Sequence, residues 1–176
     1  MNNAKVAYKT AGMSANDYMN TITSFAAALK QSTANETEAA KVANQTVIDM
    51  ADNANKMGTN MEDIQNAYQG FSKSNYTMLD NLKLGYSGTK SEMERLLKDA
   101  EKLTGIHYDI NNLSDVYNAI HEIQKNLGIT GTTAKEAMKT IDGAMKMTKA
   151  SWDNLLTGLA AVSYTHLRAH ETVLDL

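Results

Sequence analysis

The chain of 176 residues contains no cysteine and no proline, and only 6% of its residues are aromatic. Without cysteine it forms no disulfide bond, offers no thiol nucleophile and provides no thiolate ligand for zinc. Without proline, no position interrupts a helix through a missing backbone N–H. Hydrophobic residues make up 43%, and many of them are alanine. This composition is typical of helices that pack on helices.

Excess positive charge and long hydrophobic runs are also absent. The net charge is −3 and the pI is about 5.8, so the chain has no strong attraction to nucleic acid or anionic lipid. The longest apolar runs are short, such as residues 25–29, whereas a membrane span needs about 20 residues. Residues 1–6 lack the apolar stretch of a signal peptide. We therefore expect no nucleic-acid binding and no membrane span in this segment.

Hydrophobic periodicity and capping residues predict an all-α protein, with several amphipathic helices in a loose bundle or an extended coiled-coil-like array. Side chains that can cap a helix start stand at Ser14, Thr59, Thr89 and Thr133. No segment shows a convincing strand pattern. The expected helices cover residues 14–31, 35–57, 59–71, 89–104, 113–127, 133–148 and 151–159.

The expected helices fall into two groups around an irregular stretch. Residues 1–71 are predicted to form an N-terminal helical segment, and residues 89–161 a C-terminal one. Residues 72–88, which contain clusters of Ser, Asn and Gly, are predicted to be an irregular connector.

The clearest helical pattern lies in residues 35–57, which we expect to end at Gly58. Its apolar residues recur at alternating steps of three and four, which is the spacing of a heptad seam through which helices associate. We call this row the heptad seam and expect self-association through it. The seam consists of Ala40, Ala43, Val47, Met50, Ala54 and Met57, and the opposite face carries Glu38, Lys41, Gln45, Asp49, Asp52 and Lys56.

No constellation of residues predicts catalysis, a cofactor or a metal ion. Residues 85–91 are close to a phosphate-binding loop, but Thr89 separates Gly88 from the lysine, and a tight turn into a helix explains the stretch better. His166 and His170 have the spacing of a helical metal pair without a clear third ligand. His107 and His121 are isolated in the sequence, which favours ordinary surface or half-buried histidines.

Residues 76–97 resemble the signature segment of tail tape measure proteins of long-tailed bacteriophages and prophages. Residues 8–18, 49–59 and 151–160 resemble further stretches of that family in the expected order, so the resemblance covers roughly residues 5–161. Ser87 departs from the pattern, which more often has glycine there. The signature residues are Met78, Leu79, Leu82, Leu84, Gly85, Tyr86, Gly88, Thr89, Met93, Leu96 and Leu97.

The resemblance implies a structural role and not an enzyme. Such proteins extend inside the growing tail while tail tube subunits polymerise around them, and some help the genome to pass into the host. Tail tube protein and tail assembly chaperones are the implied partners. The implied location is the host cytoplasm before assembly and the lumen of the virion tail afterwards.

Two features at the ends of the chain depart from that family. Its members are far longer, so we expect this chain to be an internal fragment. The resemblance stops near Val162, and residues 162–176 look like a translated sequencing adaptor, so we expect a non-native tail there. The alternative reading of the whole chain is a helical adaptor or coiled-coil binding module unrelated to phage tails.

Overall fold

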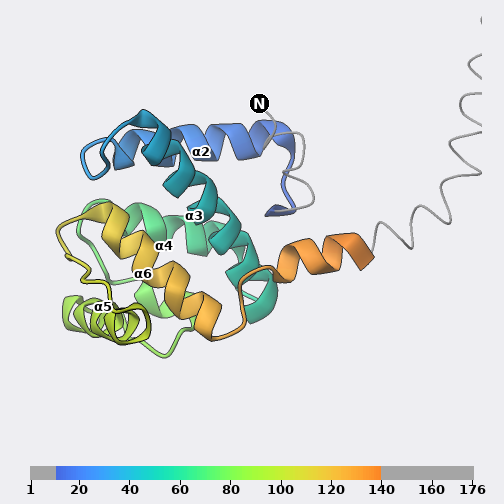
Figure 1. The fold of residues 1–176 in the computed structure, drawn as a ribbon. Coiled ribbons are helices and arrows are strands. Elements are labelled where there is room, and N and C mark those ends of the chain that lie inside the picture. The colour runs from blue at the N-terminus through green and yellow to red at the C-terminus, as the bar shows by residue number, and fades with distance from the viewer. Residues whose placement is uncertain (1–10, 140–176) are drawn as a thin grey trace, which may run out of the picture. The chain divides into compact units, whose positions relative to one another are not determined.

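The computed structural model describes residues 11–139, and these residues form an all-α bundle without strands, as predicted (Figure 1). The labelled helices of this range are α2 (Ala15–Leu29), α3 (Glu36–Met57), α4 (Met61–Phe71), the 3-10 helix η1 (Leu79–Leu82), α5 (Lys90–Thr104) and α6 (Leu113–Asn126). A further helix occupies residues 132–139. The helices expected at 151–159 and over most of 133–148 lie outside the described residues.

Local capping sets several of the helix boundaries. The side chains of Ser14, Asn35 and Thr89 each accept a hydrogen bond from the backbone N–H three residues later, at 3.0–3.2 Å. Gly58 and Gly105 end α3 and α5 with φ angles of 65° and 72°, a left-handed conformation that glycine adopts without steric cost. These starts and ends agree with the sequence prediction because short-range bonds determine them.

Two predicted caps are wrong. The Thr59 hydroxyl bonds the Asn81 carbonyl oxygen at 3.3 Å, and Asn60 caps α4 instead by accepting from the N–H two residues on. Thr133 lies inside the helix that it was expected to cap, and its own N–H donates to the Asp52 carboxylate at 2.8 Å. In both places a residue distant in the sequence forms a hydrogen bond with the threonine that was expected to cap the helix.

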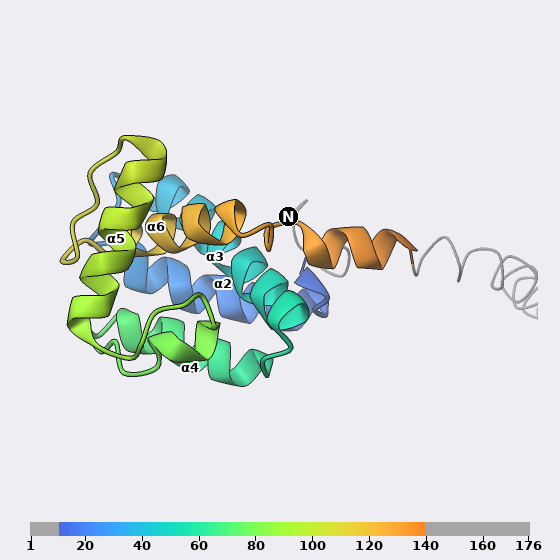
Figure 2. The same cartoon turned by 90° about the horizontal axis from the view of Figure 1, so that it is seen from below.

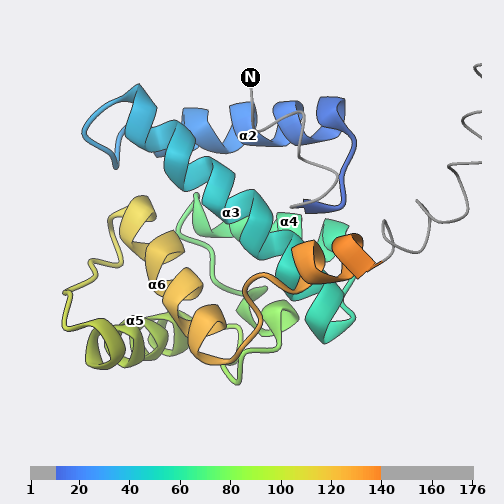
Figure 3. The same cartoon turned by 45° about the vertical axis from the view of Figure 1, so that its right-hand side comes forward.

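A single hydrophobic core joins both sides of the predicted connector, and the described residues up to Ala137 belong to one compact unit. Helix α3 is central to this unit, where it contacts α2, α4, η1 and α6, while α5 packs on α6 (Figures 2 and 3). Residues 72–88 pack into this core, because they contain η1 and four buried side chains. These are Tyr76, Leu79, Leu82 and Leu84.

The heptad seam lies on α3 and is termed the α3 seam. The buried surface of α3 is broader and more polar than this seam. Its central residues Ala43, Val47 and Met50 are fully buried, but Ala40 is exposed and Ala39 is buried in its place. Ala54 and Met57 are half-buried. Asp49 and Asp52, expected on the solvent face, are only 2% and 0% exposed. The reason is that α3 packs against neighbours on several sides, so its buried surface exceeds one heptad stripe.

The C-terminal end of α6 also differs from the prediction. The helix was expected to continue to Leu127, but α6 ends at Asn126 and Leu127 is 50% exposed. Ile129 is buried instead, at 1% exposure. Among residues 11–139, no helix is both long and apolar enough to span a bilayer.

Candidate functional site

The signature segment, residues 76–97, folds into a fixed turn that leads into α5. The guanidinium of Arg95 lies 4.3 Å from the centre of the Tyr86 ring, in a cation–π contact. The same side chain donates to the Gly85 carbonyl oxygen at 2.8 Å and pairs with Glu92 at 2.6 Å. Tyr86 in turn donates to Asp99 at 3.1 Å. Residues of α5 therefore hold the turn that precedes the helix.

Gly88 shows a close backbone approach inside this turn. A Cβ atom at Gly88 would lie 2.1 Å from the Thr77 carbonyl oxygen, far below van der Waals contact. Glycine is therefore the residue that lets the two backbone segments lie side by side. The predicted turn into a helix over 85–91 is confirmed, because Thr89 is the N-cap of α5.

The charges around the turn stabilise one another. Burial raises the pKa of Tyr86 to about 12, and the hydrogen bond to Asp99 adds to this effect. The hydrogen bond from Lys102 lowers the pKa of Asp99. The hydrogen bond from Arg95 likewise lowers the pKa of Glu92. Tyr86 thus keeps its proton while both carboxylates stay charged at neutral pH, which suits a structural role in holding the turn.

A second polar cluster lies in the interior, between α3 and α6. The Nδ1 atom of His121 is 2.9 Å and 3.1 Å from the two carboxylate oxygens of Asp49, and Gln45 donates to the same carboxylate at 3.1 Å. Asp49 has 2% of its side chain exposed and His121 has 21%. The pair therefore connects α3 and α6 through two residues that are 72 positions apart in sequence.

Burial and mutual attraction act on this pair in different ways. Burial raises the pKa of the Asp49 carboxyl, although the hydrogen bond from His121 opposes the rise. The hydrogen bond to Asp49 raises the pKa of His121, although burial opposes it. His121 is thus half-buried, which is one of the two predicted alternatives. It is not isolated, because it pairs with Asp49. The sequence did not indicate this pair, since Asp49 was expected on the solvent-facing side of its helix.

Tyrosine and glutamine side chains continue this cluster toward α4. Gln124 donates to the Tyr68 hydroxyl at 3.1 Å, and the Tyr117 hydroxyl donates to the Tyr68 backbone oxygen at 2.8 Å. The two tyrosine rings lie with their centres 5.2 Å apart. Burial raises the pKa of both tyrosines, so they remain neutral hydrogen-bonding groups.

Asp52 holds the start of the last described helix. Its carboxylate accepts from the Gly131 N–H at 2.6 Å and from the Thr133 N–H at 2.8 Å. Unpaired N–H groups at a helix start favour a negative charge, so a buried aspartate suits this position. Sequence reasoning missed the contact because the partners are about 80 residues apart.

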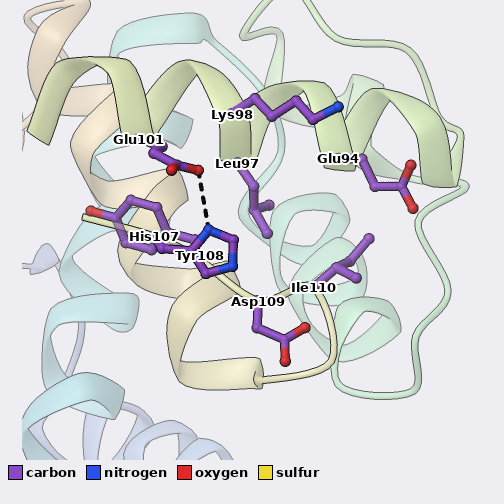
Figure 4. A pocket seen from close by; sticks show the side chains of 8 residues that line it. All are labelled: Glu94, Leu97, Lys98, Glu101, His107, Tyr108, Asp109 and Ile110. Carbon is purple, nitrogen blue, oxygen red and sulfur yellow. Dashed lines mark hydrogen bonds and ion pairs between the residues drawn. The ribbon is translucent and has the colours of Figure 1, made fainter. Parts of the chain in front are cut away.

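Two shallow grooves border α5. One of about 240 Å³ lies between α5 and residues 107–110, where Glu101 and His107 pair at 3.3 Å across an exposed surface (Figure 4). The other, of about 320 Å³, lies between α5 and α6 and includes the exposed Leu103 and Leu127. No group of three metal-ligating side chains occurs within residues 11–139. His166 and His170 lie outside that range.

No protein-family model, curated protein or solved structure matches the chain. Two features of the described residues are the candidate sites. They are the signature turn at 76–97 and the carboxylate cluster of α3, which consists of Asp49 and Asp52. The glycines gave a sequence signal for the turn. The cluster gave none, because Asp49 and Asp52 read as solvent-facing residues and their partners come from distant parts of the chain.

Proposed function

We propose that this chain is a structural segment of a phage tail tape measure protein, acting as a length ruler and scaffold for tail tube assembly and aiding genome ejection. The observation that carries the proposal is the resemblance of four separate stretches, in the expected order, to that family. The third of them, residues 76–97, lies in the described fold. There its side chains contact the protein's own turn and core, which suits a structural role.

A ruler needs a fixed rise per residue, which an α-helix supplies at about 1.5 Å. The described helices are folded back on one another, and Val47 and Met50 of the α3 seam are buried inside the same chain. The proposal therefore includes a change of partners, in which α3 leaves α2 and α6 and its seam contacts other helices in the tail. Self-association through the seam requires the same step.

Crosslinking tests this change of partners, and the cysteine-free sequence makes the experiment clean. Gln45 and His121 both bond Asp49 in the compact form, so cysteines placed at the two positions form a short crosslink in the free protein. We expect the crosslink to be lost when the protein is within assembled tails. Equal crosslinking in free and tail-bound protein contradicts an extended state of this segment.

Tail length tests the ruler itself. Deleting α3, which has 22 residues, from the tape measure gene that carries this segment is expected to shorten the tail by roughly 33 Å, at about 1.5 Å per residue. The matched control replaces α3 with another 22-residue helix in which the seam residues are polar. A ruler regains its length with this replacement. Unchanged tail length in the deletion removes the ruler role of this region.

A helical adaptor or coiled-coil binding module is the second candidate, and the shared core favours it because such a core suits independent folding. A binding module depends on the identity of its contact residues and not on their number. If the deletion shortens the tail and the polar replacement fails to restore its length, the segment acts through contacts of the seam. That outcome favours the binding module over the ruler.

A further inference from the structure

Helix α3 holds the segment 121–133 at two points through two buried carboxylates. Asp49 bonds His121 on α6, and Asp52, three residues later, bonds the N–H groups of Gly131 and Thr133. Residues three apart on a helix are neighbours on its surface, so the two carboxylates lie one above the other. The region between the two contact points includes the end of α6 and the turn that follows it.

We propose that the Asp49–His121 ion pair is a pH-sensitive latch, which holds α6 on α3 while His121 is protonated and loosens this contact when His121 loses its proton. The geometry gives the reason. Asp49 is 2% exposed, and its charge is repelled by that of Asp52 on the same helix. Once His121 is neutral, a buried carboxylate keeps its charge beside a second carboxylate and has lost the cation that compensated it.

The other groups around the pair do not replace this cation. Asp49 also accepts from the neutral Gln45 amide, and Tyr68 on α4 is raised in pKa by burial first and by the Asp49 charge second. Beside His121 on α6, Lys125 is paired with Glu122 at 3.1 Å. From α2, Tyr18 donates to Asn44 on α3, and burial raises the pKa of this tyrosine.

The direction of the pH effect follows from the two shifts. The folded state raises the pKa of His121 above 6.5, so it keeps this proton at a pH where the unfolded chain has lost it. The stabilising contribution is therefore complete below 6.5 and is lost as the pH rises through the folded pKa. The raised pKa of Asp49 acts in the same direction in a more acidic range. The folded state is thus weakened by alkali.

The test combines a histidine titration with unfolding of the whole 176-residue chain. NMR follows the His121 imidazole of the wild type and of Asp49→Asn, and urea unfolding is measured from about pH 6 to about pH 9 for the wild type and His121→Gln. His107→Gln is the matched control, because its partner Glu101 is only half-buried and the His107 side chain is 80% exposed.

We expect His121 to titrate above 6.5 in the wild type and closer to 6.5 in Asp49→Asn. For each unit by which folding raises the pKa of His121, the folding equilibrium constant falls about tenfold between acid and alkali. This dependence should disappear in His121→Gln and persist in His107→Gln. A wild-type His121 that titrates at or below 6.5 overturns the latch, as does an unchanged pH dependence in His121→Gln. Both readings stand without Asp49→Asn if that variant does not fold.

Discussion

Gly88 shows how a single residue determines the path of the signature turn. The sequence marked Gly85 and Gly88 as turn residues, but the two have different roles. Gly85 needs a positive φ angle of 87°, whereas Gly88 needs the space that a side chain would fill beside Thr77. The first property is recognisable as ordinary turn chemistry. The second depends on a close approach that only the folded chain reveals.

Replacing Gly88 by alanine is therefore expected to destabilise the fold. The added Cβ would stand 2.1 Å from a backbone oxygen, so the turn has to open. Overpacking of this kind costs about 1–3 kcal/mol, and backbone displacement adds to it. Urea unfolding followed by circular dichroism measures the loss. Ser87→Ala is the control, because Ser87 is exposed and a surface change costs within about 0.5 kcal/mol. Equal stability of the two variants contradicts the close approach.

At the scale of the helix, sequence reasoning succeeded where neighbouring residues determine the boundary. Ser14, Asn35 and Thr89 cap helices whose starts were predicted, and Gly58 ends α3 as predicted. It failed where a distant residue competes for the same group. The helix at 132–139 starts one residue before Thr133 because Asp52 binds its first N–H groups. Periodicity and capping rules cannot include a partner that only tertiary folding supplies.

Asp52 makes this helix start a testable feature. Asp52→Asn keeps the shape but leaves one amide NH₂ facing a backbone N–H, so one of the two hydrogen bonds is lost. A buried unpaired donor costs about 1–3 kcal/mol. We also expect the amide proton resonances of Gly131 and Thr133 to move upfield in an NMR spectrum, because one proton loses its hydrogen bond and the other has a neutral acceptor in place of a charged one. Asp63→Asn, at an exposed position of α4, is the control. Unchanged resonances contradict the cap.

At the scale of the whole molecule, the buried part of α3 explains both the strength and the limit of the sequence prediction. The heptad spacing correctly indicated a long helix with Val47 and Met50 facing other helices. It gave the wrong environment for Asp49 and Asp52, because a helix surrounded on several sides buries more than one stripe. The buried carboxylates of Asp49 and Asp52 accept hydrogen bonds from specific partners, and hydrophobicity alone does not identify such partners.

The same central packing predicts that the connector and the helices unfold together. Leu82 of η1 is fully buried, and the Leu82 backbone oxygen accepts from Asn53 of α3 at 2.9 Å. Leu82→Ala is expected to cost about 2–5 kcal/mol, the usual range for a buried leucine. Because one core is shared, amide exchange should accelerate in α3 and α5 alike. Leu103→Ala, at a side chain 49% exposed, should cost far less. Faster exchange confined to residues 72–88 would instead show that the connector unfolds alone and that the core is not cooperative across it.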